Sequence, residues 1–253
     1  MFSDLAHYLE NEFEDVQGWC IPQLWQSIEP LARAMRSDGD AGPVAEIGVY
    51  HGKFFIGLAK TMGAKAHNTA IDVFSMQEFN LDGAGKGDEA VFRNNLEQCG
   101  ISEATDLIEA DSMGLSDDDA AALRAKTGGF SMFSVDGCHT AEHTVNDLEF
   151  ALKVIRRDGI IFIDDYNNAN WPGVQEGIAK HYFGGSRRFV PVLYSCNKLL
   201  LCNLSFHDRY IETVLAHLKE HFPDTRCRDH ARFGYRCLSI FSDTADGAVL
   251  SRV

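Results

Sequence analysis

The sequence is short of basic residues. Its 253 residues include 23 Lys and Arg against 37 Asp and Glu, which gives a net charge of −14. A field of this sign repels phosphate backbones and anionic lipid surfaces, so we expect neither nucleic acid nor a membrane as a partner. A neutral or cationic small molecule, or a ligand held through a cation, fits this charge better.

The sequence also lacks a long apolar run and any paired-cysteine motif. No segment is long and apolar enough to span a bilayer, and the acidic start MFSDLAHYLENEFED has neither the basic nor the apolar region of a signal peptide. The seven cysteines form no C-x-x-C pair, which is typical of reduced thiols rather than of a disulfide framework or a zinc ribbon. We therefore predict a soluble, cytoplasmic protein.

Apolar residues make up 45% of the chain, enough for a sizeable core, and strand-like and helix-like patterns alternate along it. Strands are expected at 43–49, 69–74, 105–110, 130–135 and 159–164, and helices at 53–62, 89–99, 117–126, 141–155 and 173–183. This alternation predicts an α/β fold with a doubly wound, mostly parallel sheet.

The C-terminal part follows another pattern. Segments 188–195 and 198–203 are separated by only two residues, which predicts an antiparallel hairpin at one edge of the sheet. A helix at 207–222 and a strand at 235–241 complete the expected elements. The sheet would then have seven strands.

The N-terminal part is predicted to be helical. Apolar residues recur at helical spacing over 21–35, and the breaker SDGDAGP follows at 37–43. We expect a helical cap over residues 1–40 and one domain over 41–253 with a helix-strand extension at its end. The cap and the extension are surfaces through which a homo-oligomer could form.

The first strand-to-helix junction carries two glycines four residues apart, in Glu46-Ile47-Gly48-Val49-Tyr50-His51-Gly52. Glycines in such a junction allow a tight turn and bring backbone N–H groups close to a ligand at the helix start. The spacing differs from the dinucleotide pattern G-x-G-x-x-G and from a phosphate loop, so neither of those sites is expected.

Polar residues end the next two strands. Asp72 closes the second strand about twenty residues after the glycine turn, where a carboxylate can bind ribose hydroxyls. Asp111 and Ser112 close the third, where a carboxylate can accept a hydrogen bond from an adenine amino group. Taken singly, a strand-end Asp is just as often a helix N-cap, but the three junctions in this order favour a nucleoside site.

Three further carboxylates follow two later strands: Asp136 after one, and Asp164 with Asp165 after the other. If these strands are parallel neighbours, the carboxylates converge and raise one another's pKa. A divalent cation is the simplest remedy, and all-oxygen ligands favour Mg²⁺, with Mn²⁺ or Ca²⁺ as alternatives, over zinc. The competing interpretation is that Asp164 caps the next helix while Asp165 is merely exposed.

The segment His139-Thr140-Ala141-Glu142-His143 fits the H-x-x-E-H pattern of one class of zinc peptidases. Two zinc ligands at that spacing must lie within one helix, whereas a strand and an Asp-Gly turn immediately precede His139. We therefore expect His139 in the loop or the first helical turn, and a structural role for His143.

Two other features could belong to the site. The polar, glycine-rich segment 75–89 could close over a ligand as a lid, or be an ordinary mobile loop. Trp19, Trp25 and Trp171 could line the substrate side or serve core packing.

Together the first three junctions resemble those of the class I S-adenosylmethionine-dependent methyltransferases. The resemblance implies that Gly48 and Gly52 border the methionine part of the cofactor and that Glu46 supports the loop. It further implies that Asp72 holds the ribose and that Asp111 lies near the adenine. The expected cofactor-binding residues are Glu46, Gly48, Tyr50, Gly52, Asp72, Asp111, Ser112 and Asp136.

The later motifs VDGCHT, DGIIFIDDY and WPGV resemble the metal-dependent O-methyltransferases of the macrocin and mycinamicin sugar group, and the whole resemblance covers residues 40–204. It implies that the metal ligands are Asp136, Asp164 and Asp165. His139 stands three positions after the first ligand, where catechol-type relatives carry a general base. Cys138 is a departure, because some sugar-modifying relatives have an acid there.

The resemblance implies an enzyme that transfers a methyl group from S-adenosylmethionine to a hydroxyl of a small molecule. The acceptor would be a sugar of a natural product or a catechol-like phenol, and a bound ion would lower the pKa of its hydroxyl. Asp136 and His139 are the expected catalytic residues. The alternative is a cofactor-binding protein of other activity, similar to cephalosporin hydroxylases or catalytically silent.

Overall fold

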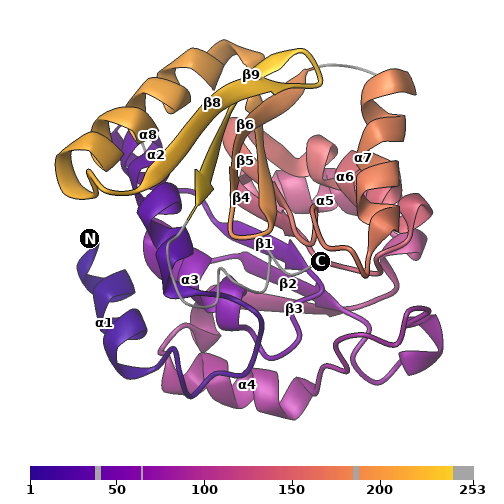
Figure 1. Ribbon diagram of the computed structural model, residues 1–253. Helices are drawn as coiled ribbons and strands as arrows, with labels where there is room; N and C mark the ends of the chain where they lie inside the picture. Colours follow the sequence, from indigo (N-terminus) through magenta and orange to yellow (C-terminus); the bar gives the residue numbers. More distant parts are fainter. Residues whose placement is uncertain (38–40, 64, 185–187, 242–253) are drawn as a thin grey trace.

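A computed structural model describes residues 1–37, 41–63, 65–184 and 188–241 of the chain. Within these residues one sheet of nine strands forms the centre of the molecule (Figure 1). The strands are β1 Val44–Ile47, β2 Asn68–Asp72, β3 Thr105–Glu109, β4 Phe130–Val135, β5 Ile155–Ile163, β6 Phe189–Ser195, β7 Lys198–Asn203, β8 Arg226–Arg232 and β9 Tyr235–Phe241.

Helices follow most of the strands. The α-helices are α1 Ser3–Asn11, α2 Trp25–Ser37, α3 Lys53–Met62, α4 Glu89–Gln98, α5 Asp117–Thr127, α6 Ala141–Val154, α7 Pro172–Gly184 and α8 His207–His221. Short 3₁₀ turns are η1 Pro22–Leu24, η2 Gln77–Phe79, η3 Ser102–Ala104, η4 Ser112–Gly114 and η5 Leu204–Phe206. Among the described residues no helix is long and apolar enough to cross a membrane.

The sheet has the order β3-β2-β1-β4-β5-β7-β6-β9-β8. Strands β1 to β5 run parallel, whereas β7 lies antiparallel between β5 and β6. The chain order reverses between β1 and β4, and the carboxyl ends of strands beside such a reversal are where ligands bind in open α/β sheets. The predicted doubly wound, mostly parallel sheet is confirmed.

The strand count and the place of the hairpin need correction. Strands β6 and β7 form the predicted antiparallel hairpin, but β9 pairs with β6 and β8 pairs with β9, so the hairpin lies inside the sheet. Strand β8 has the sequence RCRDHAR and most of its side chains are exposed. An exposed edge strand needs no apolar alternation, which is why the sequence pattern missed it.

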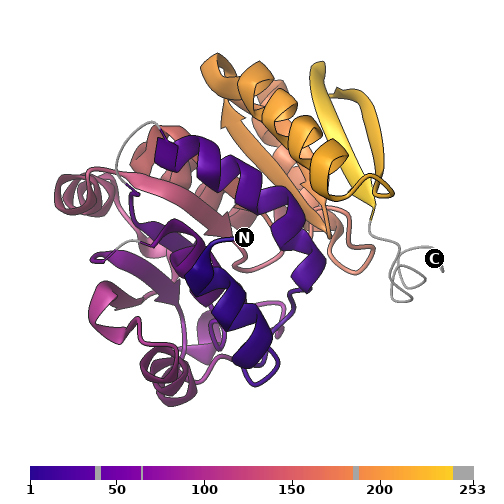
Figure 2. The same ribbon diagram turned by 90° about the vertical axis from the view of Figure 1, so that its left-hand side faces the viewer.

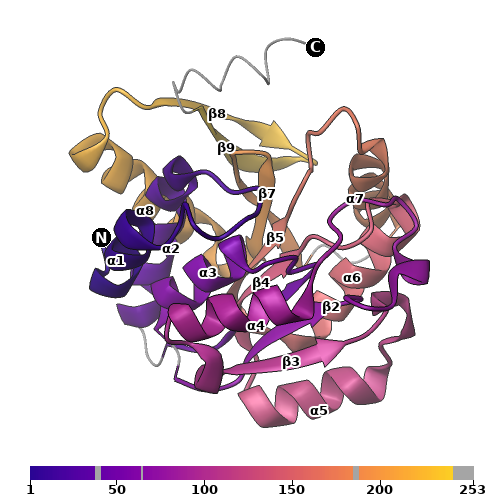
Figure 3. The same ribbon diagram turned by 90° about the horizontal axis from the view of Figure 1, so that it is seen from below.

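Apolar side chains of the central strands alternate between two cores. In β5, Ile160 and Phe162 join the core under α2, α3 and α8, whereas Ile161 and Ile163 join the core under α5, α6 and α7. This period of two is the geometry of a strand covered on both faces. Figure 2 shows α1, α2 and α8 together on one face, and Figure 3 shows α4 and α5 on either side of β3.

Side-chain caps fix where several helices begin. Asp88 accepts the backbone N–H groups of Ala90 and Val91 at α4, and Thr140 accepts that of His143 at α6. Ser116 and Asp119 form a reciprocal capping box at α5. Such caps satisfy N–H groups that have no partner within the helix. They place the strand-to-helix loops, and hence the polar residues in them, at the carboxyl edge of the sheet.

The predicted N-terminal helix at 21–35 is observed as η1 and α2. Fully buried Trp25 of α2 packs on Gly57 of α3, and the Tyr8 hydroxyl of α1 donates to the carbonyl of Lys53 at 2.8 Å. The expected break at 37–43 falls partly on residues 38–40, and the expected domain ends at 253; residues 38–40 and 242–253 lie outside the described chain.

We expect Gly57→Ala to destabilise the protein. A Cβ at Gly57 would lie 2.2 Å from the Trp25 ring. Overpacking of this kind costs about 1–3 kcal/mol and should outweigh the roughly 1 kcal/mol that alanine gains in a helix. Urea unfolding measures the difference. Gly114→Ala is the control, because a Cβ there meets nothing within 4 Å. Equal stability of the two variants would contradict the tight α2–α3 contact.

Candidate active site

The loop between β1 and α3 requires its two glycines. Gly48 has φ 82° and Gly52 has φ 93°, both in the left-handed region that favours glycine. A Cβ at Gly48 would lie 1.8 Å from the backbone oxygen of Asp136, and one at Gly52 would lie 2.9 Å from the Phe92 ring. The end of β4 therefore packs directly against this loop.

Asp72 holds the same loop from the end of β2. Its buried carboxylate accepts the backbone N–H of Tyr50 at 2.9 Å and that of Phe74 at 3.1 Å. Burial raises the pKa of Asp72, although these backbone hydrogen bonds oppose the shift. Asp72 thus fixes the left-handed turn at Tyr50. It also lines a cavity at the carboxyl edge of the sheet.

A cavity of about 1320 Å³ opens at the carboxyl edge of the sheet. Six of the eight expected cofactor-binding residues line it: Gly48, Tyr50, Asp72, Asp111, Ser112 and Asp136. Glu46 and Gly52 are outside this lining, because Glu46 is buried within β1 and Gly52 precedes α3. Ligand pockets commonly measure about 300–1,000 Å³, so this cavity has room for a cofactor and a second molecule.

At the junction after β3, Asp111 is both a helix cap and a residue of the cavity wall. Asp111 accepts the backbone N–H of Met113 at 3.1 Å and so caps η4, but it also lines the cavity. Ser112 is buried, and its carbonyl accepts the side-chain amide of Asn146 at 2.9 Å. Capping and ligand contact are therefore compatible at this position.

The three later carboxylates converge, but the structure divides them. Asp164 forms an ion pair with Lys198, and the side chains of both are almost fully buried. Its other oxygen accepts the backbone N–H of Asp165 at 2.8 Å. Asp165 has φ 51°, and its carboxylate lies next to His139 and Asp136 instead.

Burial and charge act differently on the carboxylates. Burial, reinforced by neighbouring Asp164, raises the pKa of Asp136 well above its usual range. Burial would also raise the pKa of Asp165, but hydrogen bonds from His139 and Asn168 lower it below its ordinary value. The charged form is therefore better stabilised in Asp165 than in Asp136.

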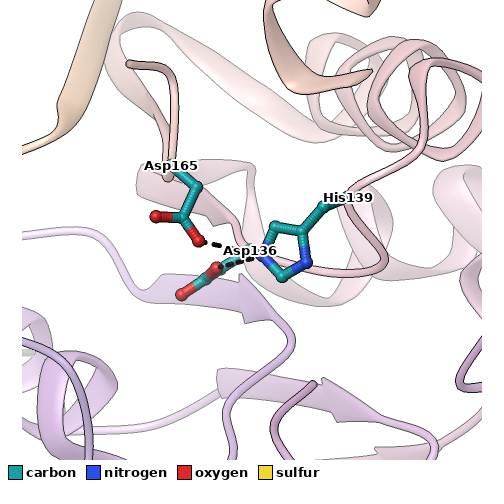
Figure 4. Close-up of side chains that lie close together, drawn as sticks. All are labelled: Asp136, His139 and Asp165. Atoms are coloured by element: carbon teal, nitrogen blue, oxygen red, sulfur yellow. Dashed lines mark ion pairs between the residues drawn. The ribbon is translucent and has the colours of Figure 1, made fainter. Parts of the chain in front are cut away.

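His139 lies beside the carboxylates of Asp136 and Asp165 (Figure 4), and it also contacts the segment before α4. Its Nε2 atom lies 3.0 Å from Asp165 Oδ2 and 3.8 Å from Asp136 Oδ1. Its Nδ1 atom and backbone N–H both approach Asp82 Oδ2, at 2.7 and 2.8 Å. The ring stacks on Trp171 with centroids 4.5 Å apart. These contacts fix the orientation of the imidazole.

The surroundings of His139 favour its charged form. Burial disfavours an imidazolium, but the nearby carboxylates of Asp136, Asp165 and Asp82 outweigh it and raise the pKa of His139 to about 11. The ring is therefore protonated at neutral pH when no other cation is near. In that state it is an acid, and it becomes a base only when the neighbouring negative charge is neutralised.

The residues present fit a small cation. One oxygen each from Asp136 and Asp165 and one ring nitrogen of His139 lie within 4.8 Å of one another. Carboxylate oxygens are the ligands that hard divalent cations prefer. Asp164, expected as a third ligand, is instead engaged with Lys198.

The zinc pattern is not assembled. His139 precedes the N-cap of α6, and His143 lies in the first turn of that helix. His143 is buried, with Nδ1 2.7 Å from the Thr140 hydroxyl. Within the described chain the metal-capable group at this place consists of Asp136, His139 and Asp165, without His143.

Sequence reasoning missed several residues of this site. Asp82 comes from the segment considered as a lid, and nothing in the sequence marks His139 as its partner. Asn168 and Asn197 both donate to Asp165 Oδ1, at 2.9 and 2.5 Å. A lysine at the head of the otherwise apolar strand KLLLCN was the one available signal for Lys198.

Residues 45–166 match the protein family described as "Methyltransferase domain". Solved structures with a similar fold include the O-methyltransferase NovP, with 13% identity, coverage of 70% of this chain and 77% of that one, and a TM-score of 0.55. CalS11, a TDP-rhamnose 3'-O-methyltransferase of calicheamicin biosynthesis, has 17% identity, coverage of 78% and 86%, and a TM-score of 0.52. Cofactor-bound Rv0187 from MTB has 16% identity, coverage of 79% and 89%, and a TM-score of 0.52.

At these identities the structural likeness shows the fold alone. A search of curated proteins finds no match to the sequence.

We expect His139 to stay protonated from about pH 6 to about pH 9 in protein treated with a chelator, because an ordinary histidine titrates near 6.5 and this one near 11. NMR of the imidazole nuclei measures this, with His139→Gln to assign the signal. His51, whose pKa burial lowers, should shift in the opposite direction and titrate below an ordinary histidine. A His139 midpoint near pH 6.5 would contradict the charge balance described above.

Proposed function

We propose that the protein is a metal-dependent O-methyltransferase, because residues 45–166 match a methyltransferase-domain family, in agreement with the sequence resemblance. It would move the methyl group of S-adenosylmethionine to a hydroxyl of a small molecule. One observation carries the proposal: a single cavity is lined both by the expected cofactor residues and by Asp136, His139 and Asp165.

The cofactor would occupy the side of the cavity next to β1, β2 and β3. The glycine loop, where missing Cβ atoms allow close approach to the backbone, and the carboxylate of Asp72 suit the methionine and ribose parts. Asp111 and Ser112 stand at the next strand end, where the adenine would lie. In this proposal Glu46 supports the glycine loop without lining the cavity, since it is buried in β1.

The acceptor would occupy the side next to His139. A sugar hydroxyl of a natural product and a catechol-like phenol both suit a site with a cation, and CalS11 acts on a nucleotide sugar. Trp19 and Trp171 line the cavity, whereas Trp25 belongs to the core. We propose that residues 1–40 act as a cap over this side, since Trp19 and Ile21 line the cavity. The seven free thiols suit the reducing cytoplasm.

The chemistry is an in-line displacement at the methyl carbon, in which the bond to sulfur breaks and a bond to the acceptor oxygen forms. The protein has to align the two reactants and exclude water. A divalent cation held by Asp136 and Asp165, with Mg²⁺ as the proposed ion, would lower the pKa of a nearby hydroxyl and also weaken the hold of these carboxylates on the His139 proton.

His139 then has the geometry of a general base. Asp82 accepts the Nδ1–H of the ring, so Nε2 is the nitrogen that takes the proton of the acceptor hydroxyl. Asp165 and Asp136 lie on the Nε2 side of the ring. Stacking on Trp171 covers one face of the imidazole and keeps water from that side.

We expect calorimetry to detect S-adenosylmethionine binding and Asp72→Asn to weaken it. Losing a hydrogen bond to a charged group costs about 1.5–3 kcal/mol, which corresponds to roughly a ten- to hundredfold loss of affinity. Asp118→Asn removes the same charge from an exposed position on α5 and serves as the control. If the wild-type protein binds no cofactor, the proposed function is wrong.

A methylation screen over glycosides and phenols should identify an acceptor, and its turnover should stop in a metal chelator. His139→Gln should lower kcat by about 10²–10⁴-fold, as for loss of a general base, without changing cofactor affinity. His7→Gln, on the exposed part of α1, is the matched control. Undiminished turnover in the chelator would refute a catalytic cation. Cofactor binding without turnover of any acceptor would favour the alternative of another activity.

A further inference from the structure

Lys198 bears on how the proposed cation is bound. We propose that Lys198 withholds Asp164 from the cation, so that Asp136 and Asp165 are its only carboxylate ligands from the protein. The inference rests on the proposed metal dependence and departs from the three-carboxylate site expected from the sequence. It makes Lys198 a positioning residue for the cation site.

The sheet itself brings Lys198 to this place. Strand β7 runs antiparallel to β5, with Leu199 opposite Ile163. The first residue of β7 therefore lies beside the residue that follows β5, which puts the ammonium of Lys198 against the carboxylate of Asp164. The side chains are 2% and 10% exposed, so the pair is shielded from solvent. Removing one partner of a buried pair is strongly destabilising, and such a pair does not open easily.

Both oxygens of Asp164 are engaged, although its carboxyl also borders that of Asp136. One of its oxygens is bound to Lys198, and the other accepts the backbone N–H of Asp165. Asp165 follows with a left-handed backbone, φ 51°, so the two successive carboxylates serve different partners. Ligand atoms of Asp136, His139 and Asp165 lie close enough together to hold one cation. Asp164 is not part of that group.

The charge of Lys198 acts chiefly on Asp164 and, more weakly, on Asp136. Its ammonium also lies 4.2 Å from the centre of the Phe54 ring, a contact that favours the charged form without neutralising it. Glu46 is a nearby carboxyl group in β1, but burial raises its pKa to about 8, so that it is mostly neutral at pH 7. Asp164 is thus the anion that Lys198 pairs with at neutral pH.

This arrangement has a consequence for catalysis. Mg²⁺ accepts one or two carboxylates and fills its remaining positions with water or substrate oxygens. With two carboxylates the cation would bind weakly to the protein alone, and oxygens of the acceptor would strengthen its binding. A third carboxylate would bind it more tightly before the acceptor arrives. Lys198 would therefore make retention of the cation depend on the acceptor.

The test measures Mn²⁺ affinity of the full chain, by the electron paramagnetic resonance signal of free Mn²⁺, without cofactor or acceptor. Asp136→Asn and Asp165→Asn should each lose at least about tenfold in affinity, because each removes one of the two carboxylate ligands. Lys198→Met releases Asp164 as a further ligand, so its affinity should rise at least about fivefold.

Two further variants guard against misfolding. Lys198→Arg keeps the charge and should keep wild-type affinity. Lys198→Met combined with Asp164→Asn removes both charges and should return to wild-type affinity, with circular dichroism to verify the fold. A purely structural ion pair would instead leave Mn²⁺ affinity unchanged in every folded Lys198 variant, and this would overturn the proposal.

An affinity of the Lys198→Met, Asp164→Asn double variant as low as that of Asp165→Asn would also overturn the role of Lys198. Failure of the wild-type chain to bind Mn²⁺ is a different result, because it overturns the metal dependence itself together with this inference.

Discussion

Asp136 and the Asp164–Asp165 pair follow two neighbouring parallel strands, and the pairing of Val135 with Ile163 brings their carboxylates to one edge of the sheet. Several anions in a largely buried place are costly unless cations compensate them. Two cationic groups come from separate parts of the fold, Lys198 from β7 and His139 from the turn after β4. The remaining polar contacts of the site orient these side chains: Asp82 contacts His139, and Asn168 and Asn197 donate to Asp165.

Backbone contacts join the loop after β1 to Asp136 at the end of β4. Gly48 can pass close to the carbonyl of Asp136 because it has no Cβ, and the N–H of Asp136 donates to Ile47 at 2.9 Å. The loop expected to hold the methionine part is therefore packed against the residue expected to hold the cation. Under the proposed function, this shared backbone would help to align the methyl donor with the acceptor oxygen.

Sequence patterns predicted where the strands end, but they did not predict which side chains pair with the residues at those ends. Buried parallel strands carry a strong apolar signal, and topology then brings their carboxyl ends together, so the positions of Asp72, Asp136 and Asp165 were predictable. The partner of Asp164 depends on a strand that returns antiparallel beside β5, with Lys198 34 residues away along the chain, and no local pattern encodes that pairing. The same holds for Asp82, which a loop carries to His139.

Under the proposed function, His139 and a divalent cation share the carboxylates of Asp136 and Asp165. These carboxylates keep the imidazole protonated, and any cation that takes up their charge weakens their hold on that proton. His139 would then be available as a base only while the cation is present. If acceptor oxygens are also needed to hold the cation, base, cation and acceptor become competent together. The withdrawal of Asp164 by Lys198 supports this coupling, since a third free carboxylate would hold the cation whether or not an acceptor were bound.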